Sequence, residues 1–294
     1  MLNRANPAFL GCEAEWERAD TVLFGAPFDS TASYRPGSRF GSRAMREESY
    51  GIETYSPYRD ADLSECSVFD AGDPELCIGD AARALGQIEQ ISAEILDAGK
   101  LPVMLGGEHL VTLGAVRQAV KRSPGLCIVQ FDAHTDLRDE YLGASLSHAA
   151  VLRRCWDLLG DGRIFQFGIR SGLREEFEWA KTHTELHRFG FDGLAETAER
   201  LAGSPVYFTV DLDVLDPSVF PGTGTPEPGG ISFLQMMDAM TLVAERCRVI
   251  GCDLVELAPA LDPSGVSTVV ACKLLRELLL TLHKSSSIAK KIGK

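Results

Sequence analysis

The sequence predicts a single-domain α/β fold, a three-layer sandwich around a central, mostly parallel sheet of about eight strands. Short β-branched or aromatic segments alternate with longer amphipathic ones, as expected for a parallel sheet covered by helices on both faces. Some short segments, such as 127–129 and 206–208, are apolar at every position, which is typical of central strands buried on both sides. No linker or internal repeat divides the 294 residues, so one large domain is expected.

The individual elements follow from this alternation. The predicted strands are the short apolar segments 21–26, 67–71, 102–105, 126–132, 163–169, 186–189, 206–213 and 249–257. The predicted helices are the amphipathic segments 80–98, 110–121, 148–159, 175–182, 193–201, 232–246 and 267–283. Gly99 is the expected end of the first helix, and Ser232 is the expected N-terminal cap of the sixth.

The two ends of the chain differ from the middle. Residues 1–20 are expected to form an N-terminal extension, and residues 21–283 the main domain. The last segment, 284–294, is rich in Ser and Lys, so we expect a flexible basic tail.

Composition restricts the partners and the compartment. The chain has 29 Lys and Arg against 42 Asp and Glu, a formal net charge of −13, so it repels phosphate backbones and no nucleic acid partner is expected. The sequence shows neither a signal-peptide pattern nor a stretch apolar enough to span a bilayer, so no membrane partner is expected. None of the eight cysteines forms a C-x-x-C pair, which favours free thiols and a cytoplasmic location.

Acidic residues and histidines follow three of the predicted strands. They are His109 after the third strand, Asp132, His134 and Asp136 after the fourth, and Asp211 and Asp213 at the end of the seventh. Because ligands bind at the carboxyl ends of parallel strands, we expect these side chains to share one site. For each segment alone, the alternative to a shared site is a structural role, with aspartates that end strands and histidines buried in the core. That explanation has to hold separately at all three strand ends.

Four clustered carboxylates repel one another strongly unless positive charge balances them. Two divalent cations balance four aspartates, and six ligands suit two metals that share bridging carboxylates better than one tetrahedral zinc. Carboxylates with some imidazole favour Mn²⁺, so we expect two Mn²⁺ per chain, with Fe²⁺, Co²⁺ and Zn²⁺ as alternatives. A two-metal site activates water, which predicts hydrolysis at a planar carbon or at phosphorus. The acidic surroundings favour a cationic substrate.

These motifs resemble the signatures of the ureohydrolase family, which includes arginases and agmatinases. The matching segments are Gly106-Gly107-Glu108-His109, Phe131-Asp132-Ala133-His134-Thr135-Asp136 and Asp211-Leu212-Asp213-Val214-Leu215-Asp216-Pro217. The resemblance covers residues 22–282, and the loop 137–143 followed by Leu146-Ser147-His148 resembles that of bacterial agmatinases. It implies an arginase/deacetylase-like fold with 21–283 as the catalytic domain, and a homo-oligomer, either a trimer or a hexamer.

The resemblance also implies a role for each site residue. One manganese ion would take His109, Asp132, Asp136 and Asp211 as ligands, and the other would take His134, Asp132, Asp211 and Asp213. Asp136 would in addition orient the nucleophile, and Glu256 would pair with the guanidinium of the substrate. His148 would contact the substrate and carry a proton to the leaving amine, while Thr225 would line the pocket.

The expected substrate is a small cationic guanidino compound. Arginases place Asn and Ser after the Asp-x-His-x-Asp segment to hold an α-carboxylate, whereas this chain has Leu137-Arg138-Asp139-Glu140. The resemblance therefore implies hydrolysis of agmatine to putrescine and urea, a step of polyamine biosynthesis. The alternatives are guanidinobutyrate, arginine or formiminoglutamate as substrate, a non-catalytic metal-binding interaction subunit, and a purely structural α/β domain. A complete set of six ligands disfavours a non-catalytic role.

Overall fold

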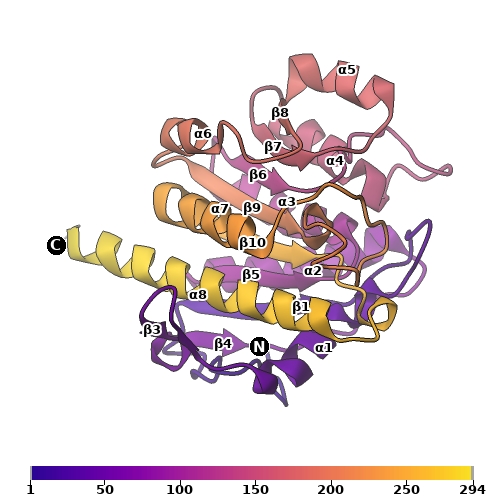
Figure 1. Cartoon of the computed structure of the whole chain (residues 1–294). Helices are drawn as coiled ribbons and strands as arrows, with labels where there is room; N and C mark the ends of the chain where they lie inside the picture. Colours follow the sequence, from indigo (N-terminus) through magenta and orange to yellow (C-terminus); the bar gives the residue numbers. More distant parts are fainter. Residues whose placement is uncertain (1, 293–294) are drawn as a thin grey trace.

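A computed structural model describes residues 2–292 and confirms the α/β fold with one central sheet. The strands of this sheet are β1 (Thr21–Ala26), β4 (Val68–Asp70), β5 (Leu101–Gly106), β6 (Cys127–Phe131), β7 (Ile164–Ile169), β8 (Glu185–Arg188), β9 (Pro205–Asp211) and β10 (Arg248–Val255). They are all parallel and lie in the order β4-β1-β5-β10-β9-β6-β7-β8 (Figure 1). The strands predicted from apolar segments are therefore confirmed.

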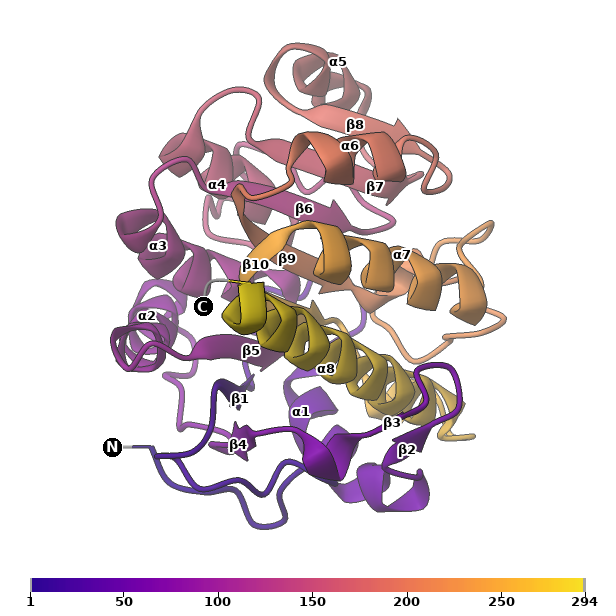
Figure 2. The same cartoon turned by 90° about the vertical axis from the view of Figure 1, so that its left-hand side faces the viewer.

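Helices cover both faces of the sheet and make the three layers (Figure 2). One face carries α1 (Gly41–Glu48), α6 (Leu194–Arg200), α7 (Phe233–Arg246) and α8 (Val266–Ile292). The other face carries α2 (Ala81–Asp97), α3 (Thr112–Arg122), α4 (Val151–Leu159) and α5 (Arg174–His183). Each layer of helices encloses its own hydrophobic core against the sheet.

The period-two geometry of a strand explains why one short segment serves both cores. On β9, Val206, Phe208 and Val210 belong to the core beneath α7 and α8, whereas Tyr207 belongs to the core on the opposite face. Burying each large apolar side chain contributes about 1.5–3 kcal/mol, so such a strand is stable only between two helical layers.

Two predicted helix boundaries are confirmed. The hydroxyl of Ser232 accepts a hydrogen bond from the backbone N–H of Gln235 and caps α7. Gly99, just after α2, has φ +70°, a left-handed conformation that glycine adopts without steric cost.

Other elements differ from the predictions. Helix α1 and a two-stranded antiparallel ribbon of β2 (Tyr55–Ser56) and β3 (Ala61–Asp62) were not predicted. The sequence of α1 is strongly polar, and the helix becomes stable where Met45 is buried against the core and Arg46 pairs with Asp70. The predicted helix 148–159 begins with a separate 3₁₀ turn, His148–Ala150, before α4.

The last helix is longer than predicted. It continues through Ile292 instead of ending at 283, and the Ser285 hydroxyl donates to the backbone oxygen of Ala244 at 3.0 Å, which links this turn to α7. Residues 293–294 of the expected tail lie outside the described residues, and the mobility of 284–294 stays a prediction. Among residues 2–292, no helix combines the length and the apolar character that crossing a membrane requires.

The reactivity of the cysteine thiols tests how well the two hydrophobic cores are packed. All eight are unpaired, seven are buried, and Cys77 alone is half-buried. Burial raises the pKa of Cys66, Cys155 and Cys272 to about 12, and the thiolate is the reactive form of a cysteine. We therefore expect one fast-reacting thiol per native chain with a disulfide reagent at pH 8, and eight after unfolding. Two or more fast thiols in the native protein would contradict this packing.

Candidate metal centre

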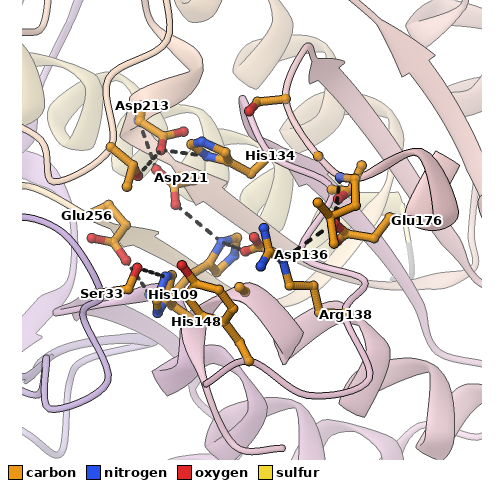
Figure 3. Close-up of a pocket in the computed structure, with 17 residues that line it drawn as sticks. Ser33, His109, His134, Asp136, Arg138, His148, Glu176, Asp211, Asp213 and Glu256 are labelled. Carbon is orange, nitrogen blue, oxygen red and sulfur yellow. Dashed lines mark hydrogen bonds and ion pairs between the residues drawn. The ribbon is translucent and has the colours of Figure 1, made fainter. Parts of the chain in front are cut away.

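The predicted site residues lie at the carboxyl ends of four neighbouring strands. In the sheet β5, β10, β9 and β6 are adjacent, so their ends form one continuous edge. His109 follows β5, Glu256 follows β10, Asp211 ends β9 and Asp136 follows β6. Together with His148 and Thr225, these residues line a pocket of about 360 Å³ (Figure 3). The structure thus brings the predicted residues of all four strands together.

His109 faces three carboxylates. Its Nδ1 lies 3.0 Å from Oδ2 of Asp132, 3.1 Å from Oδ2 of Asp136 and 3.3 Å from Oδ2 of Asp211. Within residues 2–292, this buried nitrogen has no hydrogen-bond partner of acceptable geometry. A buried polar atom in that state is costly, and a cation shared with the carboxylates satisfies it.

His134 forms the second group of ligand atoms. Its Nδ1 lies 3.0 Å from Oδ2 of Asp213 and 3.6 Å from Oδ1 of Asp132. The atoms of His109, Asp132 and Asp211 lie within 4.8 Å of one another, as do those of Asp132, His134 and Asp213. Asp132 belongs to both groups, as a bridging ligand does. Asp211 belongs to the first group only, so its bridging role stays a prediction.

The electrostatics of the cluster favour positive charge. Burial raises the pKa of Asp136 to about 7, and the charge of Asp132 raises it further. Burial alone lowers the pKa of His109, but its three close carboxylate neighbours outweigh this and raise the pKa well above the usual range. For His134 burial likewise lowers the pKa, and the charge of Asp213 reverses the direction. Two protonated rings balance only part of the negative charge of the four carboxylates. Two divalent cations would balance all of it.

The donor set fits two divalent cations of the manganese type. Four carboxylates and two imidazoles supply oxygen and nitrogen ligands, and no cysteine lines the pocket. Gln130, which is fully buried, donates an amide N–H to Oδ2 of Asp132 at 2.6 Å and orients this shared carboxylate. Gln166 in turn donates to the side-chain oxygen of Gln130 at 2.7 Å. Neither glutamine was predicted, because both sit within apolar strands and belong to no motif.

His148 lies beside Ser33 in the wall of the pocket (Figure 3). Its backbone N–H donates to the Thr31 hydroxyl at 3.2 Å, and its Nε2 lies 3.3 Å from the Ser33 hydroxyl. The Thr31 hydroxyl itself donates to the buried Glu108 at 2.6 Å. Burial lowers the pKa of His148 to about 4, so its ring is neutral at pH 7. The side chain is therefore half-buried in the wall of the pocket.

Two of the predicted residues have left-handed backbones. The φ angles are +66° at Glu256 and +52° at Asp136, a region that non-glycine residues seldom occupy outside functional sites. Oε1 of Glu256 accepts the backbone N–H of His109 at 2.8 Å, which joins the ends of β10 and β5. Burial raises the pKa of Glu256, and nearby Glu108 adds to the effect, so this position attracts a cation. Thr225 donates its hydroxyl to Oδ2 of Asp213 at 3.2 Å.

The outer pocket holds a cationic side chain whose place was not predicted. The Arg138 guanidinium lies 4.2 Å from the ring centre of Tyr141, and its Nε lies 3.6 Å from Oε2 of Glu176. Glu176 also accepts the Thr135 hydroxyl at 2.6 Å and the Leu173 N–H at 2.8 Å. The carboxylate of Glu176 is therefore already occupied by other donors, which leaves Arg138 loosely paired.

Comparisons with known proteins agree with this geometry. The family model described as "Arginase family" matches residues 19–281. The chain belongs to the arginase family. An agmatinase from Bacillus anthracis is 47% identical, with 92% of this chain and 95% of that protein covered. A crystal structure of a Clostridium difficile protein superposes with a TM-score of 0.89 at 47% identity, covering 92% and 99% of the two chains.

More distant relatives of the arginase family bear on specificity. A guanidinobutyrase from Pseudomonas aeruginosa is 35% identical, with 92% of this chain and 88% of that protein covered. Membership of the arginase family, together with the complete set of candidate ligands, makes the chain a ureohydrolase enzyme. The arginase-like fold expected from the sequence motifs is confirmed.

Proposed function

We propose that this enzyme hydrolyses agmatine to putrescine and urea with two Mn²⁺ ions bound at the carboxyl ends of β5, β6 and β9. One observation carries the proposal: all six candidate ligands are present and assembled in a chain 47% identical to an agmatinase. When bound, the two ions supply a water molecule of lowered pKa as nucleophile. A cytoplasmic location and a trimeric or hexameric assembly belong to the same proposal.

The side chains of the pocket perform the other steps. Glu256 pairs with the guanidinium of the substrate, which its buried carboxylate attracts electrostatically. Asp136 accepts a hydrogen bond from the nucleophilic water and orients it. The neutral ring of His148 receives a proton and passes it to the leaving amine. Thr225, next to Asp213, lines the end of the pocket where urea forms.

A second candidate is hydrolysis of guanidinobutyrate. Arg138 places a positive charge in the outer pocket, and its pairing with Glu176 at 3.6 Å is loose. A substrate whose tail ends in a carboxylate would pair with this guanidinium, whereas the ammonium of agmatine has to be accepted beside it. The identity to an agmatinase outweighs this one charge, so agmatine remains the first proposal.

Urea release from agmatine, guanidinobutyrate and arginine by the Mn²⁺-loaded enzyme separates the candidates. We expect kcat/KM for agmatine to exceed the other two by at least about tenfold, or about 1.4 kcal/mol, because the chain is 47% identical to an agmatinase over 92% of its length. A higher kcat/KM for guanidinobutyrate would establish the second candidate. No urea from any of the three would refute the proposal.

A further inference from the structure

A carboxylate that touches neither the pocket nor a candidate ligand lies beneath the metal centre. Asp253, on β10, is fully buried between β9 and α3. It accepts three hydroxyl hydrogen bonds: from Thr209 at 2.6 Å, from Tyr207 at 2.7 Å and from Thr112 at 2.9 Å. Burying a charged group is costly even when it is hydrogen-bonded, so its place in a central strand calls for a function.

The Thr209 hydroxyl connects this carboxylate to His109. Because it donates its proton to Asp253, its oxygen presents only lone pairs to His109, whose Nε2 lies 2.9 Å away. A contact between that oxygen and Nε2 is favourable only when Nε2 carries a proton. A neutral imidazole has a single N–H, so Nδ1 then carries the lone pair, and Nδ1 is the atom that faces the three carboxylates.

We propose that Asp253, acting through Thr209, holds His109 in the Nε2–H tautomer and so sets the affinity of the first metal site. Both are positioning residues, and the inference rests on the proposed metal centre but not on the choice of substrate. Histidine ligands generally donate their second N–H to such a partner, which fixes the ring and makes the ligating nitrogen more basic. His134 lacks this arrangement, since its Nε2 faces the partly exposed Glu227 at 3.7 Å. The effect is therefore confined to one of the two ions.

Three single substitutions test the inference. Thr209→Val keeps the shape of the side chain and suits a central strand, but it removes the hydroxyl between Asp253 and His109. Thr209→Ser restores the hydroxyl. Thr112→Val is the matched control, because it removes a hydroxyl that donates to the same carboxylate but does not hydrogen-bond to the His109 ring. Metal-stripped protein is titrated with Mn²⁺, and the free ion is measured by its electron paramagnetic resonance signal.

In wild-type protein we expect two bound Mn²⁺ ions per chain. Thr209→Val should weaken one of them about 10–100-fold and leave the other nearly unchanged, as expected when a group that hydrogen-bonds to a metal ligand is lost. Thr209→Ser and Thr112→Val should keep both affinities. Equal affinities in Thr209→Val and Thr112→Val would overturn the inference alone, while the proposed function would stand. A wild-type protein that binds no Mn²⁺ would overturn both.

A second measurement is made on the wild-type protein. In ¹⁵N-histidine-labelled wild-type protein loaded with diamagnetic Zn²⁺, the His109 ring should show a protonated Nε2 and an unprotonated Nδ1. Comparison with a His109→Asn spectrum identifies its signals among those of the six histidines. A protonated Nδ1 would overturn the proposed arrangement.

Discussion

Asp132→Ala is expected to abolish binding of both metal ions and to lower kcat/KM for urea release by more than about a thousandfold. Asp132 is the one residue that offers ligand atoms to both groups of the candidate metal centre. Without it, His109 and His134 each lose an adjacent carboxylate, and the centre loses the link between its two halves. Metal content per chain, measured by elemental analysis, and urea release under Mn²⁺ saturation test the prediction.

The control for this variant comes from the same segment of the chain. Asp139 lies three residues beyond the Asp-x-His-x-Asp motif, its side chain is 76% exposed, and it pairs with Arg154. Asp139→Ala makes the same change of charge outside the pocket, so two bound ions and nearly full activity are expected. Two tightly bound ions in Asp132→Ala would show that the ligands have been assigned wrongly.

His148→Gln is expected to lower kcat by about 10²–10⁴, with a smaller change in KM, because it removes a proton-transfer group but keeps the pocket polar. Burial lowers the pKa of the wild-type ring to about 4, so the ring is neutral at pH 7 and has a nitrogen free to accept a proton. His183→Gln is the matched control: His183 pairs with Asp161 outside the pocket, and full activity is expected. Unchanged turnover in His148→Gln between pH 7 and pH 9 would exclude the proton-transfer role.

The lowered pKa of His148 also makes the free energy of unfolding depend on pH. Unfolded His148 binds a proton below about pH 6.5, whereas the folded ring does so only near pH 4. Between these values the unfolded chain holds the additional proton, so His148 contributes to a fall in the free energy of unfolding as the pH decreases from 6.5 to 4. Thermal unfolding of metal-free protein across this window should show a smaller decrease in Tm for His148→Gln than for wild type. Parallel curves would contradict the buried, neutral ring.

Much of the site was predictable because its residues follow strands directly. A strand with apolar residues on both faces is recognisable from a few positions, and the polar residues after it have to lie at the sheet edge. His109, Asp132 and Asp211 were predicted in this way, and the structure places them in one group. The helix α1 was not predictable from local pattern, because its sequence is polar. It is stabilised by ion pairs of Arg46 with Asp70 and Asp73, which lie outside the helix.

The groups that support the ligands depend on the order of the strands. Thr209 and Asp253 look like ordinary strand residues, and they meet only because β9 and β10 are neighbours in the sheet. Thr112 reaches the same carboxylate from α3, 141 residues away along the chain. In the same way, Glu108 and Thr31 combine to hold the backbone of His148.

The sequence by itself determined the α/β class, the strand ends and the six candidate ligands, because each depends on a local pattern of a few residues. Only the tertiary structure decided which buried groups orient those ligands and that Arg138 lines the pocket. The physical reason is that hydrogen bonds form over about 3 Å in space, between residues that the order of strands, and not their sequence spacing, brings together.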